Sequence, residues 1–443
     1  MRTSRDVMCV FAASAVVLVL VGSPGVAHGQ SCHPGWTCIR VPTAHGDARS
    51  VAIHAYPSDN VVNIIVEREY LLLPGNEVIT GNIGQYWVQG TITGEHSPPL
   101  TGPHAIPTDP VDNMAPHLTG KTTPDFQAEF LIAIPSAACA QDRDIALVTW
   151  QQVPPPAVDI ITTTNVYTAT PPLCIGGSDP SLARLSNSNL RAAWLQNDAA
   201  PQDVYYALQT GASWGAPIEV GDSLTDKKSA SILVDPGLDE LRIAWYENDI
   251  PDNLGITTWF GDTTVALYTA IPGSASVVVY HPWLVRHPSN GQVDLFYRSR
   301  NNTTGVTAIE RQVCPGPCVV KVPTPWSMAA PTVLNSGPGD AGHDYPQSVV
   351  SANTGRQFLV YHKKSESGKT AVWFTERCGI AGSWSAPIQL MSPTNGTYWT
   401  DFVLSQAAPA LAVNETNTWI HVVFTTTAFG DAWWVRKKFD PCP

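Results

Sequence analysis

The sequence predicts an all-β fold on three grounds: its proline content, its low charge and an internal repeat. The chain has 443 residues, of which 38 are proline and 33 glycine, and only 14% are charged. Proline spread along the whole length interrupts helices, because it lacks the backbone N–H and clashes with the preceding turn. A hydrophobic fraction of 44% excludes a disordered chain, and the low charge excludes a coiled coil. The net charge of −12 argues against a nucleic-acid binder, which needs a basic face.

An internal repeat organises the chain. The segment NLRAAWLQND at 189–198 returns 51 residues later as ELRIAWYEND at 240–249, and the pattern continues as QVDLFY at 292–297. A second landmark, proline or serine and often followed by leucine two places on, lies 14 or 15 residues before each aromatic. The intervening stretches read as short strands joined by Gly, Asn, Asp and Pro turns, so each unit predicts a four-stranded sheet. Four-stranded units repeated in this way describe the blades of a β-propeller.

Counting the landmarks predicts seven blades. The units begin near Ser50, Pro116, Pro180, Ser231, Pro282, Pro346 and Pro409. Six blades are the alternative, if the weak first unit is an irregular insertion. The last unit has only three predicted strands, the third at 432–439. A further predicted strand at 36–42, near the N-terminus, belongs to no other unit. Pairing of these two strands would close the ring and remove exposed sheet edges.

The aromatic landmarks are predicted to occupy equivalent positions and to pack between blades, where they bury large apolar areas. They are Phe130, Trp194, Trp245, Phe296, Tyr361 and Phe424. Most of the unusual tryptophan content is therefore assigned to building the ring. Residues that break the repeat carry the functional signal.

The first 29 residues are predicted to be a signal peptide. Arg2 and Arg5 precede an apolar run from 7 to 21, and Ala-His-Gly at 27–29 supplies small residues before a cleavage site. The run of about 15 residues is shorter than the roughly 20 that span a bilayer. An uncleaved membrane anchor is the alternative. Residues 30–443 are then expected to form one propeller domain that is secreted or periplasmic, monomeric and without a membrane span.

Cysteine usage agrees with export. Beyond Cys9, eight cysteines remain: Cys32, Cys38, Cys139, Cys174, Cys314, Cys318, Cys378 and Cys442. Eight cysteines allow 105 pairings, so the sequence does not determine the connectivity. Pro-Gly turns favour the local pairs Cys32–Cys38 and Cys314–Cys318, after which Cys139–Cys174 and Cys378–Cys442 would follow. Neither paired Cys-x-x-Cys motifs nor tetrahedral sets of histidines occur, so we expect no metal site and no cofactor.

The repeat units resemble those of sialidase-like, or BNR-type, propellers. The segments DVYYALQTGASWGAPIEV at 203–220 and AVWFTERCGIAGSWSAPIQL at 371–390 carry the resemblance, which extends over 180–439. Sialidases of this family have Ser-x-Asp-x-Gly-x-x-Trp turns and an arginine triad that clamps a carboxylate. Here the turns before Trp214 and Trp384 lack the Asp, so the motif is degenerate. The resemblance implies the propeller fold and leaves the activity open.

Candidate ligand-binding residues break the repeat at the starts of first strands or on the loops of the same face. They are Asp179, Glu247, His281, Trp283, Arg298, His343, Asp344, Tyr345, Trp399 and Asp401. Among them are four acids. A glycosidase needs two carboxylates about 5 to 10 Å apart, but acids in turns also cap and form those turns. No catalytic residue is therefore assigned.

The aromatic candidates favour a site on the axis. Successive first strands meet around the centre of a propeller, so His281 and Tyr345 are predicted to share a rim. The tryptophans that break the repeat are predicted to stack against the C–H faces of a sugar: Trp283, Trp326, Trp399 and one of Trp433 or Trp434. The residues at the equivalent positions of other units differ, which argues for a single axial site.

We therefore expect an exported propeller that binds a carbohydrate or an extracellular protein. We expect it to catalyse no reaction and to bind no nucleic acid. The alternative is a sialidase-like glycoside hydrolase or lyase with its active site on the axial face. Two acids and an arginine converging on the axis would favour the enzyme, whereas apolar or small residues there would argue against it. A scaffold protein, the third possibility, would have no concave site.

Overall fold

The structure of this chain is a computed structural model. It describes residues 31–41, 47–55, 62–69, 83–88, 100–105, 114–120, 127–139, 143–151, 160–171, 176–185, 189–197, 202–220, 226–235, 240–248, 253–260, 266–272, 277–318, 332–336, 344–364, 370–392, 409–426 and 431–442. The predicted signal peptide lies outside these residues. All regular elements within them are β-strands, as the composition predicts. In these ranges no helix is long and apolar enough to cross a membrane.

Strands that follow one another in the sequence pair antiparallel into sheets, mostly of four. The sheet nearest the N-terminus contains β3 (Asp47–Ala55), β4 (Val62–Glu69), β5 (Ile83–Val88) and β6 (Leu100–Ala105). The next contains β7 (Met114–Gly120), β8 (Gln127–Pro135), β9 (Arg143–Gln151) and β10 (Ile160–Tyr167). The third contains β11 (Gly176–Arg184), β12 (Leu190–Asn197) and β13 (Asp203–Thr210), with β14 (Ser213–Trp214) and β15 (Ile218–Val220) both paired to β13.

The remaining sheets repeat this order. The fourth contains β16 (Asp226–Asp235), β17 (Glu240–Asn248), β18 (Asn253–Phe260) and β19 (Ala266–Pro272). The fifth contains β20 (Val277–Arg286), β21 (Val293–Asn301), β22 (Thr307–Cys314) and β23 (Thr332–Ser336). The sixth contains β24 (Asp344–Val350), β25 (Arg356–Lys364), β26 (Thr370–Cys378) and β27 (Ile388–Gln389). The last contains β29 (Ala410–Asn414), β30 (Trp419–Thr426) and β31 (Asp431–Lys438), joined by β2 (Thr37–Val41) from the other end of the chain.

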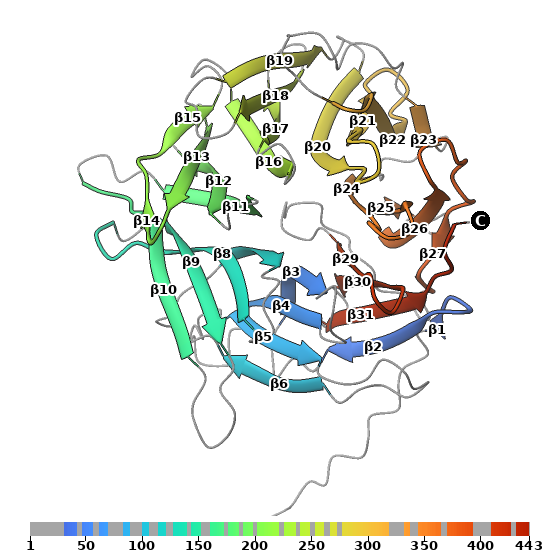
Figure 1. Cartoon of the computed structure of the whole chain (residues 1–443), viewed down its shortest axis with the longest axis horizontal. Helices are drawn as coiled ribbons and strands as arrows, with labels where there is room; N and C mark the ends of the chain where they lie inside the picture. Colours follow the sequence, from blue (N-terminus) through green and yellow to red (C-terminus); the bar gives the residue numbers. More distant parts are fainter. Residues whose placement is uncertain are drawn as a thin grey trace, which may run out of the picture.

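The sheets lie side by side around a common centre, with their first strands innermost (Figure 1). The first strands contact one another in succession, β3 with β7, β7 with β11, and so on through β24 with β29. The succession returns to its start, because β29 also contacts β3. Residues at equivalent places near the starts of neighbouring first strands are therefore brought together at the centre.

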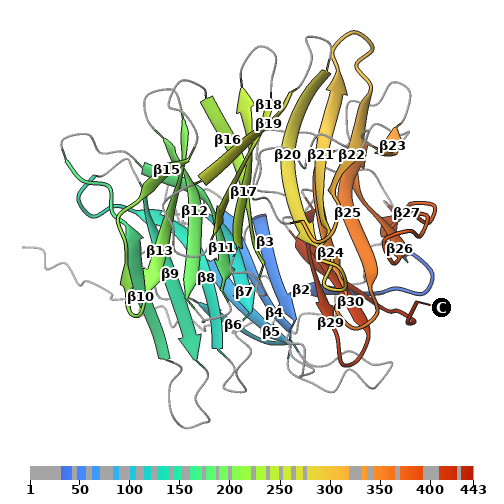
Figure 2. The same cartoon turned by 45° about the horizontal axis from the view of Figure 1, so that its top comes forward.

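The two ends of the chain meet as the sequence predicts. β2 pairs antiparallel with β31, so that Thr37 lies opposite Arg436 and Val41 opposite Ala432. The short β1 (Ser31–Cys32) pairs with β28 (Met391–Ser392), which follows the sixth sheet. Figure 2 shows this N-terminal segment, in blue, lying beside the orange and red strands of the last two sheets. The N-terminal segment thus fastens the end of the chain.

A β-bulge recurs at the same place in six of the first strands. In each, two residues stand opposite one residue of the second strand: 49–50 in β3, 115–116 in β7, 179–180 in β11, 229–230 in β16, 281–282 in β20 and 345–346 in β24. A bulge bends its strand and re-aims a side chain. The repeated bulge therefore turns one set of equivalent residues away from the regular sheet faces.

The bulge also defines which aromatic residues are equivalent. The single residue opposite each bulge is Trp194 in the third sheet, Trp245 in the fourth and Tyr361 in the sixth. In the fifth sheet it is Tyr297 rather than the predicted Phe296. In the second sheet it is Ile132 rather than Phe130. The sequence therefore located Phe296 one residue and Phe130 two residues away from the equivalent position. A shift of one residue matters, because adjacent residues of a strand face opposite sides.

The large aromatics pack between neighbouring sheets, as predicted. Trp245 is fully buried and packs with Ile243 of its own sheet and Tyr206 of the preceding sheet. Gly255 on the neighbouring strand makes room for this ring, because a Cβ at that position would overlap the indole. Phe296 is also fully buried, but it faces Tyr361 of the following sheet. The core of the molecule is thus a series of apolar layers between sheets.

Disulfides join three of the predicted cysteine pairs. Cys32–Cys38, Cys314–Cys318 and Cys378–Cys442 have Cα–Cα distances of 6.0, 5.5 and 5.4 Å. Cys139 is also disulfide-bonded. Its predicted partner Cys174 lies outside the described residues, so that pairing stays a prediction. Three disulfides in one chain are typical of an oxidising compartment.

Cation and ring contacts line the seam between the last sheet and the first. The indole N–H of Trp434 donates to Nδ1 of His421 at 3.2 Å, and both side chains are fully buried. The Arg436 guanidinium lies 4.8 Å from the Trp434 ring centre. Burial, together with the charge of Arg436, lowers the pKa of His421 to about 3. The imidazole is therefore neutral in the folded chain.

Acid is expected to destabilise this seam. The pKa of a histidine is 6.5 in the unfolded chain, and that of His421 is about 3 in the folded chain. Its contribution to stability is therefore complete above pH 6.5 and is lost as the pH falls from 6.5 toward 3. Between pH 7 and pH 4.5 the group is expected to remove about 3 kcal/mol of stability. Urea unfolding at both pH values measures it, with His421→Gln as the comparison. Equal acid losses in the two proteins would assign the effect to other groups.

Candidate functional site

The candidate site begins at two bulged residues in neighbouring sheets. His281 on β20 and Tyr345 on β24 have backbone φ angles of 47° and 49°. Left-handed φ is uncommon for bulky side chains, and such strain costs on the order of 1–3 kcal/mol per residue. Each residue also precedes a proline, which restricts its backbone further. Strained residues of this kind cluster at functional sites, so these two mark a candidate site.

The bulges bring the two rings face to face. The ring centres of His281 and Tyr345 are 4.1 Å apart, with 26° between the ring planes. Tyr345 makes an edge-to-face contact of 5.9 Å with His362 of its own sheet. The rings of His281 and Tyr345 are half-buried, so each keeps part of its surface open. The shared rim expected from the repeat is thus present as a stacked pair.

A second aromatic pair extends this surface toward the fourth sheet. Tyr280, next to His281, makes an edge-to-face contact of 4.9 Å with Tyr246 on β17. The guanidinium of Arg298 lies 5.0 Å from the Tyr280 ring centre, within cation–π range. Together Tyr246, Tyr280, His281, Arg298, Tyr345 and His362 form what we call the rim cluster. It combines aromatic faces with a cation and with hydrogen-bonding groups.

An apolar cavity of about 460 Å³ follows the rim cluster along the first strands. The lining residues come from β3, β20, β24 and β29 and from the segments after β24 and β29: Val51, Ala52, Ile53, His54, Ala55, Trp283, Gln347, Val349, Ala352, Ala410, Leu411, Ala412, Val413 and Glu415. Trp283 and Gln347 stand two residues after His281 and Tyr345 on the same strands. We call this space the axial cavity. Most of its lining is aliphatic.

Two polar side chains of the axial cavity, Glu415 and Trp283, are hydrogen-bonded to the protein itself. The Glu415 carboxylate accepts hydrogen bonds from the hydroxyl of Ser351 and from the amides of Ala352 and Asn353, at 2.7, 2.7 and 3.2 Å. The Trp283 indole N–H donates to the Ser348 carbonyl at 2.9 Å. Glu415 therefore caps a turn of the neighbouring sheet. Its carboxylate is committed to that role.

Glu247, a predicted candidate acid, is buried beneath the same face. It is only 5% exposed, and the indole N–H of Trp245 donates to its Oε1 at 3.0 Å. Lys227 lies opposite Glu247 in the strand pairing and forms a buried ion pair of 2.7 Å with Asp203. These contacts give Glu247 a structural environment. The sequence showed no sign of the Lys227–Asp203 pair, whose members come from different sheets.

For Asp179 and Asp344, two other predicted acids, the structure gives the position in the strand pairing. Asp179 occupies a bulge of β11 at the position equivalent to His281 and Tyr345. Asp344 begins β24, opposite His362 in the pairing. His343, Trp399 and Asp401 lie outside the described residues and stay candidates.

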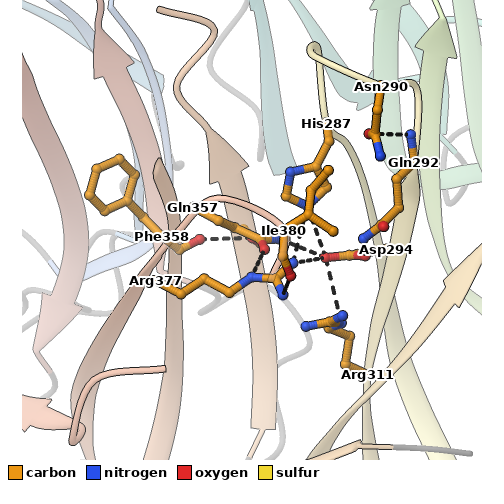
Figure 3. A network of polar contacts seen from close by, with 10 residues as sticks. His287, Asn290, Gln292, Asp294, Arg311, Gln357, Phe358, Arg377 and Ile380 are labelled. Atoms are coloured by element: carbon orange, nitrogen blue, oxygen red, sulfur yellow. Dashed lines mark hydrogen bonds and ion pairs between the residues drawn. The ribbon is translucent and has the colours of Figure 1, made fainter. Parts of the chain in front are cut away.

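A buried polar network joins the fifth and sixth sheets on a different part of the fold (Figure 3). Its centre is Asp294 on β21, whose side chain is fully buried. Oδ2 of Asp294 accepts from Nη2 of Arg377 at 2.8 Å, from Gln357 at 3.1 Å and from His287 at 3.1 Å, and Gln292 donates to Oδ1 at 2.8 Å. Two of these donors belong to β25 and β26 of the neighbouring sheet. The network is thus a tie between sheets.

Electrostatics keeps this network charged. Burial alone would raise the pKa of Asp294, but the hydrogen bond from His287 and the charges of Arg311 and Arg377 hold it below its ordinary value. Burial lowers the pKa of Arg377 to about 10, which leaves the guanidinium charged at neutral pH. Arg377 also donates to the carbonyl of Ile380 at 2.8 Å. Arg377 and Arg311 therefore share the single carboxylate of Asp294, which ties the two sheets together.

Of the two arrangements, the rim cluster is the one that has half-buried rings and a cavity next to it along the same strands. Among the described residues no three His, Cys, Asp or Glu side chains gather as a metal site would require. The sequence named His281, Arg298 and Tyr345 of the rim cluster and Trp283 of the cavity. It did not name Tyr246, Tyr280 and His362. The missed residues adjoin the landmarks, where repetition suggested packing. Their aromatic character next to a non-repeating position was the available signal.

Comparison with known proteins gives likenesses of low similarity. No protein-family model and no curated protein matches the chain. Similar solved structures include the polysaccharide lyase Uly1, at 10% identity over 90% of this chain and 91% of that one, with a TM-score of 0.49. The Hadza microbial sialidase Hz136 is 12% identical over 90% and 95%, with a TM-score of 0.48. A protein of unknown function from Dyadobacter fermentans DSM 18053 is 12% identical over 92% and 100%, with a TM-score of 0.47. These values are too low to carry a conclusion about the chemistry of this chain.

Proposed function

We propose that the chain is an exported, seven-bladed β-propeller that binds a carbohydrate at the rim cluster and catalyses no reaction. The fold assignment is supported by the succession of first strands that returns from β29 to β3 and by the β2–β31 pairing. Seven blades rather than six are favoured because β3–β6 form a four-stranded sheet with the same bulge as the other units. Residues 30–443 would then be one domain.

The stacked pair His281–Tyr345 is the observation that carries the binding proposal. Two aromatic rings are held in strained backbone positions at the axis and keep part of their surface accessible. Sugars offer apolar C–H faces to such rings and hydroxyl groups to a neighbouring guanidinium and imidazole. Arg298 and His281 supply those polar groups in the rim cluster. A few polar groups beside an apolar concavity are the usual make-up of a ligand site.

The absence of catalysis is proposed from the state of the carboxylates described near the axis. Hydrolysis of a glycosidic bond needs an acid and a base or nucleophile at a set separation. Glu415 caps a turn, and Glu247 accepts a hydrogen bond from Trp245. The alternative, a glycoside hydrolase or lyase, rests on Asp179, which shares the bulge position of His281 and Tyr345. Export, and with it a secreted or periplasmic location, is supported by the disulfides.

Tyr345→Gly and His281→Gly separate binding from folding. Glycine adopts a left-handed φ without strain, so both variants are expected to keep a melting temperature within a few degrees of the parent. Loss of a stacking ring is expected to weaken glycan binding at least tenfold, or about 1.4 kcal/mol. A glycan array ranks ligands, and titration of the best one gives the affinity.

Thr163→Ala on the exposed face of β10 serves as the control and is expected to bind as the parent does. Undiminished binding by both glycine variants would place the site elsewhere. A panel of fluorogenic glycosides tests catalysis in parallel. Turnover that disappears in Asp179→Ala would replace the binding proposal by the enzyme.

A further inference from the structure

We propose that the axial cavity binds an uncharged aliphatic chain, so that the ligand is a carbohydrate bearing an alkyl or acyl group. The sugar half of this inference rests on the proposed function of the rim cluster. The aliphatic half rests on the cavity alone. The two halves can therefore fail separately.

The size and lining of the cavity point to an apolar chain. Its volume of about 460 Å³ falls within the roughly 300–1,000 Å³ of small-molecule sites. Valine, alanine, leucine and isoleucine make up most of the wall, and Trp283 and His54 contribute the rings among the described lining residues. Burial of methylene groups against such a wall is favourable in proportion to the area removed from water.

The charges around the cavity exclude an ionic occupant. Burial holds the pKa of His54 at about 4, so its ring is neutral at pH 7. The Glu415 carboxylate, the only one among the lining residues that the structure describes, is hydrogen-bonded to the turn at 351–353. A negative charge in the ligand would meet no cation among these lining residues, and a positive charge would meet only the Glu415 carboxylate, which the turn already binds. Poorly compensated burial of a charge is costly. An uncharged chain meets no such penalty.

The cavity and the rim cluster are consecutive along two strands. On β20 the rim residue His281 is followed two places on by Trp283 of the cavity, and on β24 Tyr345 is followed by Gln347. The Glu415 hydrogen bonds span the opposite end of the cavity. A ligand that reaches from the rim into the cavity passes from aromatic and cationic groups to aliphatic ones. Its own chemistry must change in the same order, from sugar to hydrocarbon.

Filling the cavity tests the aliphatic half with 1-octanol as the probe. Ala52→Leu and Val349→Phe add volume at two different walls, and Ala381→Leu adds the same apolar group at an exposed turn. A ligand that binds only the folded state raises the melting temperature. Octanol is expected to raise it for the parent and for Ala381→Leu by several degrees, and by less than one degree for the filled variants. No rise in the parent, or an equal rise in both filled variants, would overturn the proposal.

Paired glycosides test the link to the sugar. Each glycan that binds on the array is compared as its methyl and its n-octyl glycoside, with the same four proteins. The octyl form is expected to bind at least tenfold more tightly to the parent and to Ala381→Leu, and less than twofold more tightly to the filled variants. Glycan binding without an octyl advantage would reject the inference and keep the carbohydrate function. Binding of octanol with no glycan recognised would reject the carbohydrate function and leave the aliphatic cavity.

Discussion

Replacing Asp294 by alanine is expected to lower the free energy of unfolding by about 3–5 kcal/mol. The side chain is fully buried and accepts hydrogen bonds from Arg377, Gln357, His287 and Gln292. Without it, the buried guanidinium of Arg377 loses its counter-charge, and several donors lose their acceptor. Removal of one partner of a buried charge pair is more costly than removal of both.

Urea unfolding of Asp294→Ala, Arg377→Met and the double variant measures this effect. The double variant is expected to lose less than the sum of the single losses, because the two side chains share one interaction. Additive losses would show that the carboxylate and the guanidinium act independently. Arg356→Met, which breaks the more exposed pair with Glu376, is the control and is expected to lose about 1 kcal/mol or less.

The same carboxylate predicts a pH dependence. Because its folded pKa lies below the ordinary value of 3.8, its contribution is present in full above that value and is lost as the pH falls through the folded pKa. The stability difference between the parent and Asp294→Asn is therefore expected to shrink below pH 3.8. A difference that stays constant to pH 3 would mean that the charge of Asp294 does not stabilise the fold.

Removing the Cys378–Cys442 disulfide is expected to cost about 4 kcal/mol. In the chain-entropy account, a bridge stabilises the fold by limiting the unfolded chain, and the benefit grows with the closed loop. This bridge joins residues 64 apart and fastens the C-terminal segment to the end of β26. The Cys32–Cys38 bridge closes a loop of only 6 and is expected to contribute about 2 kcal/mol.

Two double variants compare the bridges directly, Cys378→Ala with Cys442→Ala and Cys32→Ala with Cys38→Ala. Urea unfolding of each, with and without a reducing agent, gives the two losses. In each variant, the reducing agent should cause no further loss of stability from the bridge that has already been removed. Equal losses from the long and the short loop would contradict the entropic account and indicate that native-state packing dominates.

The repeat predicted most of the first strands, but it did not fix which aromatic residues are equivalent. Landmarks at Pro180, Ser231, Pro282 and Pro346 located four first strands, and the ends of the chain were correctly paired. The assignment of Phe296 as a landmark was off by one residue, because Tyr297 is the residue opposite the bulge. Neighbouring positions in a strand face different layers. Apolar character marks a residue as buried but does not say which neighbouring sheet it meets.

Part of the rim cluster could be named from the sequence for a related reason. His281 and Tyr345 hold the same position in consecutive repeats, so their proximity follows from the ring and is observed as a stack. Tyr246 and Tyr280 were assigned no role, because single residues beside a landmark show no periodic signal. The axial cavity was also beyond prediction. Its lining comes from four strands that are distant in sequence.

The sequence alone predicted the strand units, the pairing of the two ends, the apolar layers and a shared aromatic rim, and it favoured the two local cysteine bridges. These depend on periodicity and turn chemistry, which are properties of neighbouring residues. The tertiary structure decided the bulges that hold His281 and Tyr345 in left-handed conformations, the axial cavity and the Asp294 network. The donors to Asp294 from the sixth sheet, Gln357 and Arg377, lie 63 and 83 residues away in the chain. Such contacts exist only once sheets stand against each other, because burial and partner geometry, rather than local pattern, select the groups that must pair.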